Sequence, residues 1–413
     1  MQEKEKTKAL VQAQSQPHTQ QREAGEPPKS YWLRISALYT VAYRALLLVL
    51  PLFAVLFVVT CSRAFSYDSL YCFAKDLQSA ASFVPSDYQT VSYTYTKGSS
   101  QTLSYRGGVA HVGSGGIEIY SPDGERLLDV PDSLKEPRAV ASHKYLLSYD
   151  FGGKSFTVTN AYAKLYRGET EFPIYGAAVS DTGYFALITA SDQHLSQVLI
   201  YDANFKLMQR FGRASATTAV SLSSNGRYVA ITGISSADGK KQSVVELYRV
   251  GIEKVDFQVR IENELALALS FTDNRHMALL TDTAVRVLDL DGEWKDEARF
   301  EGSVPVAYDF NESGALLCVQ SDALNAENRV IVLDKRGALR YELQVNGDVR
   351  AAALSEDKAV LLKGDAVCSI AADGGSLKET TIQAGASDIF ATDGAHLRVI
   401  YPDKAVYLHF DEL

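Results

Sequence analysis

The chain has 413 residues, a formal net charge of −9 and four cysteines. Hydrophobic residues make up 46 % and charged residues 22 %, a globular composition that excludes a disordered or collagen-like chain. Four cysteines in this length also exclude a disulfide-dense scaffold. Residues 1–44 carry +3, so the remaining residues carry −12. This acidic body argues against nucleic acid as a partner, because phosphate binding needs a positive field.

The N-terminal segment 1–34 is rich in Gln, Lys and Glu and has no apolar period over most of its length. Such a segment cannot bury enough apolar surface to offset the entropy of ordering. We therefore expect a disordered cytoplasmic tail.

Residues 35–62 are predicted to form a transmembrane helix with an aromatic and basic flank. Eighteen uncharged residues, 45–62, lie between Arg44 and Arg63. At 1.5 Å per residue they span about 27 Å as a helix, close to the thickness of the bilayer core. These residues would contact membrane lipid. The basic flank stays in the cytoplasm by the positive-inside rule, which puts residues 63–413 outside the cytoplasmic membrane of a single-pass protein.

A cleaved signal peptide is the alternative for the same segment. Its apolar core would be 46–59, which has a suitable length. However, Ser62-Arg63-Ala64 is a weak cleavage site, and the 44 residues before the apolar segment make a very long leader.

Residues 63–87 are predicted to form a juxtamembrane helix and a linker. Within them, five apolar residues fall on one helical face, and Pro85 prevents the helix from continuing. These five residues are Leu70, Phe73, Ala74, Leu77 and Ala81.

The remainder of the chain repeats a pattern of a small or apolar strand, a tight polar turn and a second strand. Clear copies are AAVSDTGYFALIT (177–189), AVSLSSNGRYVAIT (219–232), ALSFTDNRHMALLT (268–281), AYDFNESGALLCVQ (307–320), AAALSEDKAVLLK (351–363) and DIFATDGAHLRVIY (388–401). A second hairpin of alternating apolar and polar residues follows most copies. Each unit is thus four short antiparallel strands in roughly 40 residues, the pattern of a β-propeller blade.

The ends of the repeat region predict how the ring closes. The last unit stops one strand short at Leu413, whereas 88–96 is an alternating strand that precedes the first unit. Pairing of these two ends would complete the last blade. The region 88–413 is therefore predicted to be an all-β, eight-bladed propeller of four-stranded antiparallel blades. A seven-bladed ring is the alternative, because the first two units are irregular.

The repeats resemble WD40-like and YVTN-type propeller repeats, in which a Ser-Pro-Asp-Gly-like turn precedes a strand. The match covers residues 88–413, but the Trp-Asp dipeptide and the Gly-His pair of WD40 blades are absent. The whole layout is similar to the uncharacterised, single-span, membrane-anchored propeller proteins of Gram-positive, clostridia-type bacteria. This resemblance implies a topology and no particular activity.

No local motif predicts catalytic, cofactor-binding or metal-binding residues. The seven histidines form neither a His-x-His nor a His-Glu-x-x-His pair, although a site assembled across blades stays open. The stretch 289–292 lacks calcium-loop spacing, and 153–155 lacks the first glycine of a phosphate loop. Both are predicted to be turns between strands. Cys318 and Cys368 fall on strands of consecutive blades, where they are either buried thiols or an interblade disulfide.

These observations favour a non-enzymatic module, without cofactors, that binds or scaffolds proteins at the cell envelope. The expected partner is an envelope protein that docks on loops held by a rigid ring. The alternative is a small-ligand receptor or an enzyme with a site at the propeller axis, built from single residues of many blades. A sensor that signals through the N-terminal tail is a third option.

Overall fold

The computed structural model describes residues 29–60, 90–237, 239–322, 327–356, 358–391 and 396–409. They belong to two compact units, Met1–Ala81 and Ser82–Leu413. The predicted juxtamembrane helix and linker at 63–87, and the predicted tail up to residue 28, lie outside the described residues.

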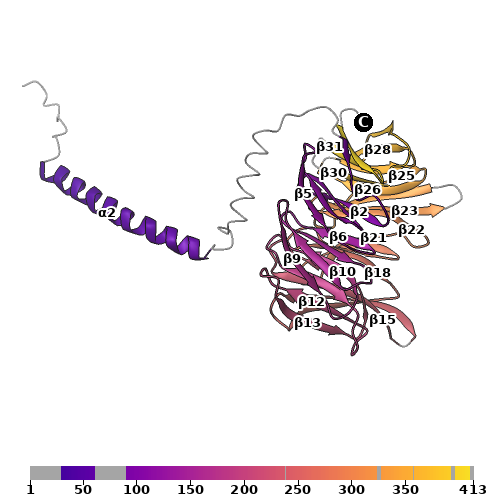
Figure 1. Cartoon of the computed structure of the whole chain (residues 1–413), viewed down its shortest axis with the longest axis horizontal. Helices are drawn as coiled ribbons and strands as arrows, with labels where there is room; N and C mark the ends of the chain where they lie inside the picture. The colour runs from indigo at the N-terminus through magenta and orange to yellow at the C-terminus, as the bar shows by residue number, and fades with distance from the viewer. Residues whose placement is uncertain are drawn as a thin grey trace, which may run out of the picture. The chain divides into compact units, whose positions relative to one another are not determined.

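Helix α2 (Lys29–Thr60) is the element described in the first unit (Figure 1). It begins at Lys29 rather than at the expected residue 35, because no Pro or Gly interrupts the sequence from Lys29 to Leu50. Its segment Ser36–Phe53 has a mean hydropathy of 1.6 and is long and apolar enough to cross a membrane. This segment overlaps the predicted span 45–62, and a retained anchor and a signal sequence both meet the criterion.

The described residues of the second unit form eight four-stranded antiparallel sheets, which confirms the eight-bladed propeller and excludes seven blades. From the axis outward, the strands of the first four blades are β2 (Ser100–Tyr105), β3 (Gly108–Gly113), β4 (Gly116–Tyr120) and β5 (Arg126–Pro131) in blade 1; β6 (Pro137–Ala141), β7 (Leu146–Asp150), β8 (Ser155–Thr159) and β9 (Lys164–Glu169) in blade 2; β10 (Ile174–Val179), β11 (Phe185–Thr189), β12 (Ser196–Tyr201) and β13 (Leu207–Arg213) in blade 3; and β14 (Ala216–Leu222), β15 (Tyr228–Ala237), β16 (Lys240–Arg249) and β17 (Val255–Glu262) in blade 4. Those of the last four are β18 (Ala266–Phe271), β19 (Met277–Thr281), β20 (Ala284–Leu288) and β21 (Trp294–Arg299) in blade 5; β22 (Val304–Asn311), β23 (Gly314–Asp322), β24 (Glu327–Leu333) and β25 (Leu339–Asn346) in blade 6; β26 (Val349–Leu354), β27 (Lys358–Lys363), β28 (Ala366–Ala371) and β29 (Leu377–Thr381) in blade 7; and β30 (Asp388–Ala391), β31 (His396–Ile400), β32 (Lys404–His409) and β1 (Thr90–Ser92) in blade 8.

Blade 8 is built from both ends of the propeller. Strand β1 pairs antiparallel with β32 through Thr90, Val91 and Ser92, and becomes the outermost strand of the blade. Figure 1 shows the yellow strands β30 and β31 beside the indigo strands β2 and β5. The ring is therefore closed non-covalently within blade 8, between β32 and β1, whereas β1 continues along the chain into β2 of blade 1. We name the region where β1, the rest of blade 8 and blade 1 meet the seam.

The core consists of eight apolar clusters, each enclosed by two neighbouring blades. Successive side chains of a strand point to opposite faces of its sheet, so every blade contributes to two clusters. In β7, for example, Leu146 packs in the cluster shared with blade 1, whereas Leu147 packs in the one shared with blade 3. This alternation explains why the middle strands are almost wholly apolar, and why a single blade cannot be stable alone.

We name the strands of each blade A to D from the axis outward. Because neighbouring strands are antiparallel, the A–B and C–D connections emerge on one face of the ring (the AB–CD face). The B–C and D–A connections emerge on the other (the BC–DA face). Most B strands have five or six residues, but β15 has ten and β23 has nine. Their hairpins project past the neighbouring strands on the BC–DA face (Figure 1).

Candidate functional site

Buried ionisable residues occupy the same position, the centre of strand C, in three blades. They are Glu118 in β4, Glu246 in β16 and Arg286 in β20, exposed by 0 %, 6 % and 1 %. In each of these blades, one residue of strand C pairs with the first residue of strand D. The buried ionisable residue lies two positions before that strand C residue. In the sequence, each of these residues is a single charge between two apolar residues. This pattern could have indicated a buried ion pair, but it matches no known motif and was not predicted. Because a buried charge is costly unless it is paired, each of these residues has specific partners.

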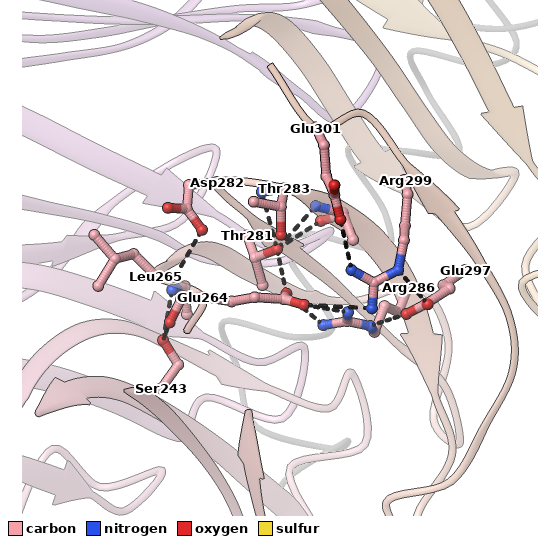
Figure 2. A network of polar contacts seen from close by, with 12 residues as sticks. Ser243, Glu264, Leu265, Thr281, Asp282, Thr283, Arg286, Glu297, Arg299 and Glu301 are labelled. Carbon is pink, nitrogen blue, oxygen red and sulfur yellow. Dashed lines mark hydrogen bonds and ion pairs between the residues drawn. The ribbon is translucent and has the colours of Figure 1, made fainter. Parts of the chain in front are cut away.

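The partners of Arg286 form what we name the Arg286 network: Glu264, Thr281, Arg286, Glu297 and Arg299 (Figure 2). Nη1 and Nη2 of Arg286 donate to the two carboxylate oxygens of Glu264, each at 2.8 Å. Nε of Arg286 donates to Glu297 at 2.8 Å, and Nε of Arg299 donates to the same carboxylate at 2.6 Å. Thr281 Oγ1 donates to Glu264 at 2.7 Å. The two-point contact between Arg286 and Glu264 is the strongest geometry for this pair of groups.

The charges and hydrogen bonds of the Arg286 network stabilise the fold and are not arranged for catalysis. Burial by itself raises the pKa of Glu264 and of Glu297, but the hydrogen bonds that they accept and the charges of Arg286 and Arg299 together outweigh burial and hold both pKa values below their ordinary value. Each oxygen of the two carboxylates accepts a hydrogen bond. Neither carboxylate is therefore placed to act as a general base.

The turn that carries Glu264 joins blade 4 to blade 5. Ser243 Oγ, from β16, donates to the Glu264 carbonyl at 2.9 Å and accepts from the Ala266 amide at 2.7 Å. The Leu265 amide donates to Asp282 Oδ1, in blade 5, at 2.8 Å. Figure 2 shows these groups converging on the turn from both blades. The result is a rigid D–A connection next to exposed residues of the BC–DA face.

The seam has polar contacts on both faces of the ring. On the BC–DA face, the Glu118 carboxylate accepts from the Thr94 amide at 2.8 Å. On the AB–CD face, Nη2 of Arg398 donates to the carbonyls of Gly107 at 3.1 Å and Pro122 at 2.8 Å. Arg398 lies in blade 8, is fully buried, and its acceptors lie in blade 1. The Arg398 contacts join the C-terminal strands to blade 1, whereas the Glu118 contact fixes to blade 1 the segment that follows β1.

His111 supports the same junction as a neutral imidazole. Its Nε2 lies 3.1 Å from the Tyr95 carbonyl, which can only accept, so Nε2 carries the hydrogen. Nδ1 then accepts from Thr102 Oγ1 at 2.9 Å. The ring stacks on Tyr93 with centroids 4.0 Å apart. Burial lowers the pKa of His111, which keeps it uncharged at neutral pH.

Ser, His and Asp side chains do meet on the AB–CD face, but in an order unsuited to nucleophilic catalysis. Asp181 accepts from Ser224 Oγ through one oxygen, and the same oxygen lies 3.3 Å from His143 Nδ1. In a catalytic triad the imidazole stands between the hydroxyl and the carboxylate, whereas here the carboxylate stands in the middle. The three residues belong to the A–B turns of blades 2, 3 and 4, which they connect.

The motifs singled out in the sequence lie in connections. Asp289 Oδ1 accepts from the Asp291 amide at 2.9 Å and from the Glu293 amide at 3.0 Å, which closes the turn between β20 and β21. Residues 153–155 lie where β7 connects to β8. Within the described ranges, no group of three His, Cys, Asp or Glu residues is arranged to hold a metal ion.

Cys318 and Cys368 are free thiols in the cluster between blades 6 and 7. Of the two alternatives left by the sequence, the structure therefore favours buried thiols over an interblade disulfide. Burial raises the pKa of Cys318 to about 12 and that of Cys368 to about 11, so neither is an activated nucleophile. Cys61 and Cys72 lie outside the described residues.

Two carboxylates lie on the innermost strands. Asp309 in β22 accepts from the Leu354 amide of blade 7 at 2.8 Å and from Asn311 Nδ2 at 2.9 Å. Burial, with a smaller contribution from the charge of Asp388 in β30, raises the pKa of Asp309 to about 6. Burial also raises the pKa of Asp388. The charged form of Asp309 is thus disfavoured in the fold, although its hydrogen bonds join two blades.

Replacing Asp309 with Asn is expected to stabilise the protein above pH 6 and to leave it almost unchanged at pH 4. The folded pKa is about 6 and the ordinary value is 3.8, so between them the folded state holds a proton that the unfolded state releases. Wild-type stability therefore falls as the pH rises through this range, and the difference approaches 3 kcal/mol at most, roughly, at pH 7. Thermal unfolding between pH 4 and 8 measures it. Asp192→Asn, on an exposed residue, is the control, and parallel profiles for Asp309→Asn and wild type would contradict the assignment.

Among the described residues of the propeller, five exposed large apolar side chains lie on the BC–DA face, whereas Ile252 lies in a C–D connection of the opposite face and Tyr308 lies within β22. The five on the BC–DA face follow strand B, precede strand C or begin strand A, and their exposed fractions lie between 44 % and 71 %. These residues are Phe151, Tyr175, Leu195, Leu267 and Val304. The rings of Phe151 and Tyr175 are in edge-to-face contact, with centroids 5.7 Å apart. Apolar residues also begin strand D in blades 3 to 7. Because an apolar residue occupies this position in five successive blades, it is expected to belong to the repeat pattern that packs the outer edge of the ring.

Comparison with protein families gives one match, which covers residues 84–408. The chain belongs to DUF5711, a family of unknown function. No curated protein matches the chain. The family assignment therefore supports a shared fold and supplies no activity.

Solved structures share the architecture at low sequence identity. BamB from Moraxella catarrhalis is 11 % identical with a TM-score of 0.52, and the match covers 77 % of this chain and 98 % of BamB. The quinohemoprotein alcohol dehydrogenase ADHIIG from Pseudomonas putida HK5 is 9 % identical with a TM-score of 0.51, and covers 77 % of this chain and 75 % of the enzyme. At such identities the likeness concerns the fold alone.

Proposed function

We propose that this protein is a non-enzymatic, membrane-anchored propeller that binds another protein of the cell envelope through its BC–DA face. The observation that carries the proposal is the group of exposed apolar side chains on that face. Scattered exposed apolar residues are ordinary in a globular protein, but Phe151 and Tyr175 form a contacting aromatic pair. Aromatic residues of this kind are enriched where proteins bind proteins.

The surroundings of the apolar residues suit a docking surface. The hairpins β15–β16 and β23–β24 project on the BC–DA face on either side of blade 5. Leu267 and Val304 lie at the start of the A strands of blades 5 and 6, between the two hairpins. The Arg286 network holds the connection that precedes Leu267. A rigid ring that presents exposed loops binds a partner with little loss of conformational entropy.

In the proposed topology, α2 stays in the cytoplasmic membrane, the N-terminus is cytoplasmic and the propeller lies outside. The length and hydropathy of α2, and the basic residues before residue 45, support this arrangement. The resemblance to membrane-anchored propellers of Gram-positive bacteria agrees with it. An N-terminal epitope tag distinguishes the alternatives. With a retained anchor, the tag stays in the membrane fraction and only the propeller is digested by protease outside the cell. With a cleaved signal peptide, the tag is lost.

The binding surface is tested by a photo-cross-linking residue placed at Tyr175, with the same residue at Leu339 as control. Leu339 is 52 % exposed and Tyr175 is 49 % exposed, but Leu339 begins a D strand on the AB–CD side. We expect a reproducible cross-linked envelope protein from position 175 in intact cells and none from position 339. Replacing Phe151 with Ser is expected to weaken the cross-link. Equal cross-linking at both positions, or none at 175 from a folded protein, would contradict the proposal.

A receptor or enzyme with a site at the axis is the second candidate, and Asp309 and Asp388 on the innermost strands are the observation that favours it. An axial site predicts that Asp309→Asn abolishes ligand binding while cross-linking from position 175 persists. A docking surface on the BC–DA face predicts that Phe151→Ser weakens cross-linking and that Asp309→Asn does not.

A further inference from the structure

Two histidines lie opposite each other at the AB–CD end of blade 8. His396 begins β31 and His409 ends β32, and the two residues are direct partners in the antiparallel ladder. Their ring centroids are 4.8 Å apart, with an interplanar angle of 82°. Both residues are partly exposed, so an ion from solvent can reach the imidazoles.

The separation of the two ring centroids is close to that of two imidazoles bound to one metal ion. Two rings that each place a nitrogen about 2.1 Å from one ion, at a tetrahedral angle, have centroids roughly 5 Å apart. Directly opposed residues of antiparallel strands hold their Cβ atoms at a fixed short separation, so the backbone preorganises the pair. Imidazole is a preferred ligand of late first-row divalent ions, and Cu²⁺ binds such sites more tightly than Zn²⁺.

We propose that His396 and His409 form a two-histidine site for a late first-row divalent transition metal ion, with water completing the coordination. The site goes beyond the proposed docking function, because it lies on the opposite face of the ring. The sequence analysis found no paired histidines because these two residues are separated along the chain, and only the β31–β32 hairpin brings them together.

The neighbouring residues connect this site to the seam. Tyr407 stacks on His396 with centroids 4.9 Å apart. The Arg398 guanidinium carbon lies 4.7 Å from the centroid of the Tyr407 ring. Arg398 in turn donates to the carbonyls of Gly107 and Pro122 in blade 1. A bound ion would cross-link β31 to β32 beside the contacts that close the ring. The positive charge of Arg398 weakens cation binding, so the affinity is expected to be below that of a three-histidine site.

Titration of the full-length protein in detergent micelles with Cu²⁺, followed by electron paramagnetic resonance, tests the proposal. We expect two nitrogen ligands in the wild type, and one nitrogen with at least about tenfold weaker binding in His396→Gln and in His409→Gln. His194→Gln is the matched control, since His194 is an exposed histidine in blade 3. It is expected to bind Cu²⁺ like the wild type.

A second measurement separates metal binding from the aromatic packing of the two rings, which also gives an edge-to-face pair. Zn²⁺ should raise the thermal midpoint of the wild type and of His194→Gln, because binding to the folded state alone stabilises it. It should have no such effect on His396→Gln or His409→Gln. Cu²⁺ affinity and nitrogen count that are the same in all four proteins would overturn the proposal. The proposal would also be overturned if Zn²⁺ raised the thermal midpoint of both His396→Gln and His409→Gln.

Discussion

Replacing Arg286 with Met is expected to lower the free energy of unfolding by about 3–5 kcal/mol. The substitution keeps much of the side-chain volume but removes the two-point contact to Glu264 and the contact to Glu297. The Glu264 side chain is only 8 % exposed, so its charge would be left buried with the longer contact to Arg299, at 3.7 Å, as its remaining ion pair. Removing one partner of a buried ion pair is costly because the other charge stays uncompensated.

The double variant Arg286→Met/Glu264→Gln identifies the cause. The amide at position 264 can still accept from Thr281 Oγ1 and carries no charge, so the double variant is expected to be more stable than Arg286→Met alone. Arg350→Met is the matched control. Its Nε lies 2.9 Å from Asp348, but both side chains are exposed, and the expected cost is below about 1 kcal/mol. Thermal or urea unfolding gives each difference. If the double variant loses as much free energy of unfolding as Arg286→Met and Glu264→Gln lose together, Arg286 stabilises the blade by packing and not by neutralising Glu264.

The Arg286 network also makes a prediction for acid. The pKa of Glu264 lies below its ordinary value of 4.5 in the folded state. Its contribution to stability is therefore present above that value and is lost as the pH falls through the folded pKa. Wild type and Arg286→Met should converge in stability as the pH falls below about 4.5.

Replacing Glu118 with Ala is expected to open the seam while the rest of the ring stays folded. Glu118 is fully buried and accepts from the amides of Thr94 and Tyr95 at 2.8 and 3.4 Å. The loss removes the acceptor of two backbone amides, of the exposed Thr94 and the half-buried Tyr95, whereas the Tyr120 hydroxyl keeps the Ser92 carbonyl as acceptor at 3.0 Å. We therefore expect a cost near the lower end of about 1–3 kcal/mol. Strand β1 pairs with β32 over only three residues, so few ladder contacts remain to compensate.

Hydrogen exchange measures this local opening. In Glu118→Ala we expect faster exchange of the amides in residues 90–97 and in β32, with the middle strands of blades 3 to 6 unchanged. Glu379→Ala is the control, because Glu379 is exposed on the outer strand of blade 7 and pairs with Lys363 at 2.8 Å. It should leave the exchange at the seam unchanged. Uniformly faster exchange around the whole ring would mean that the blades unfold as one unit and that the seam has no separate stability.

Arg398 gives an independent test from the other face of the ring. Replacing it with Met removes donors from the Gly107 and Pro122 carbonyls and should increase exchange in the same segments. The two substitutions lie on opposite faces of the seam. If either contact alone can keep the seam closed, the effect of the double variant is expected to exceed the sum of the two single effects.

What the sequence by itself determined is the part of the structure that depends on local pattern. Alternating apolar residues and polar turns specify antiparallel hairpins, and the repeat of about 40 residues specifies blades whose two apolar faces must be covered by neighbours. The unpaired ends of the repeat region predicted how the ring closes, and the chain does pair β1 with β32 there. The uninterrupted apolar segment before residue 60 predicted one long helix, although its first turn starts earlier than expected.

Only the tertiary structure decided which polar residues meet. Glu118, Glu246 and Arg286 look like isolated charges in apolar strands, and their partners come from other strands or from a neighbouring blade. Arg398 reaches a carbonyl 291 residues away along the chain. His396 and His409 become neighbours only when β31 pairs with β32. A hydrogen bond or ion pair depends on distances of a few ångströms set by register, ring closure and packing, and such distances leave no periodic trace in a single sequence.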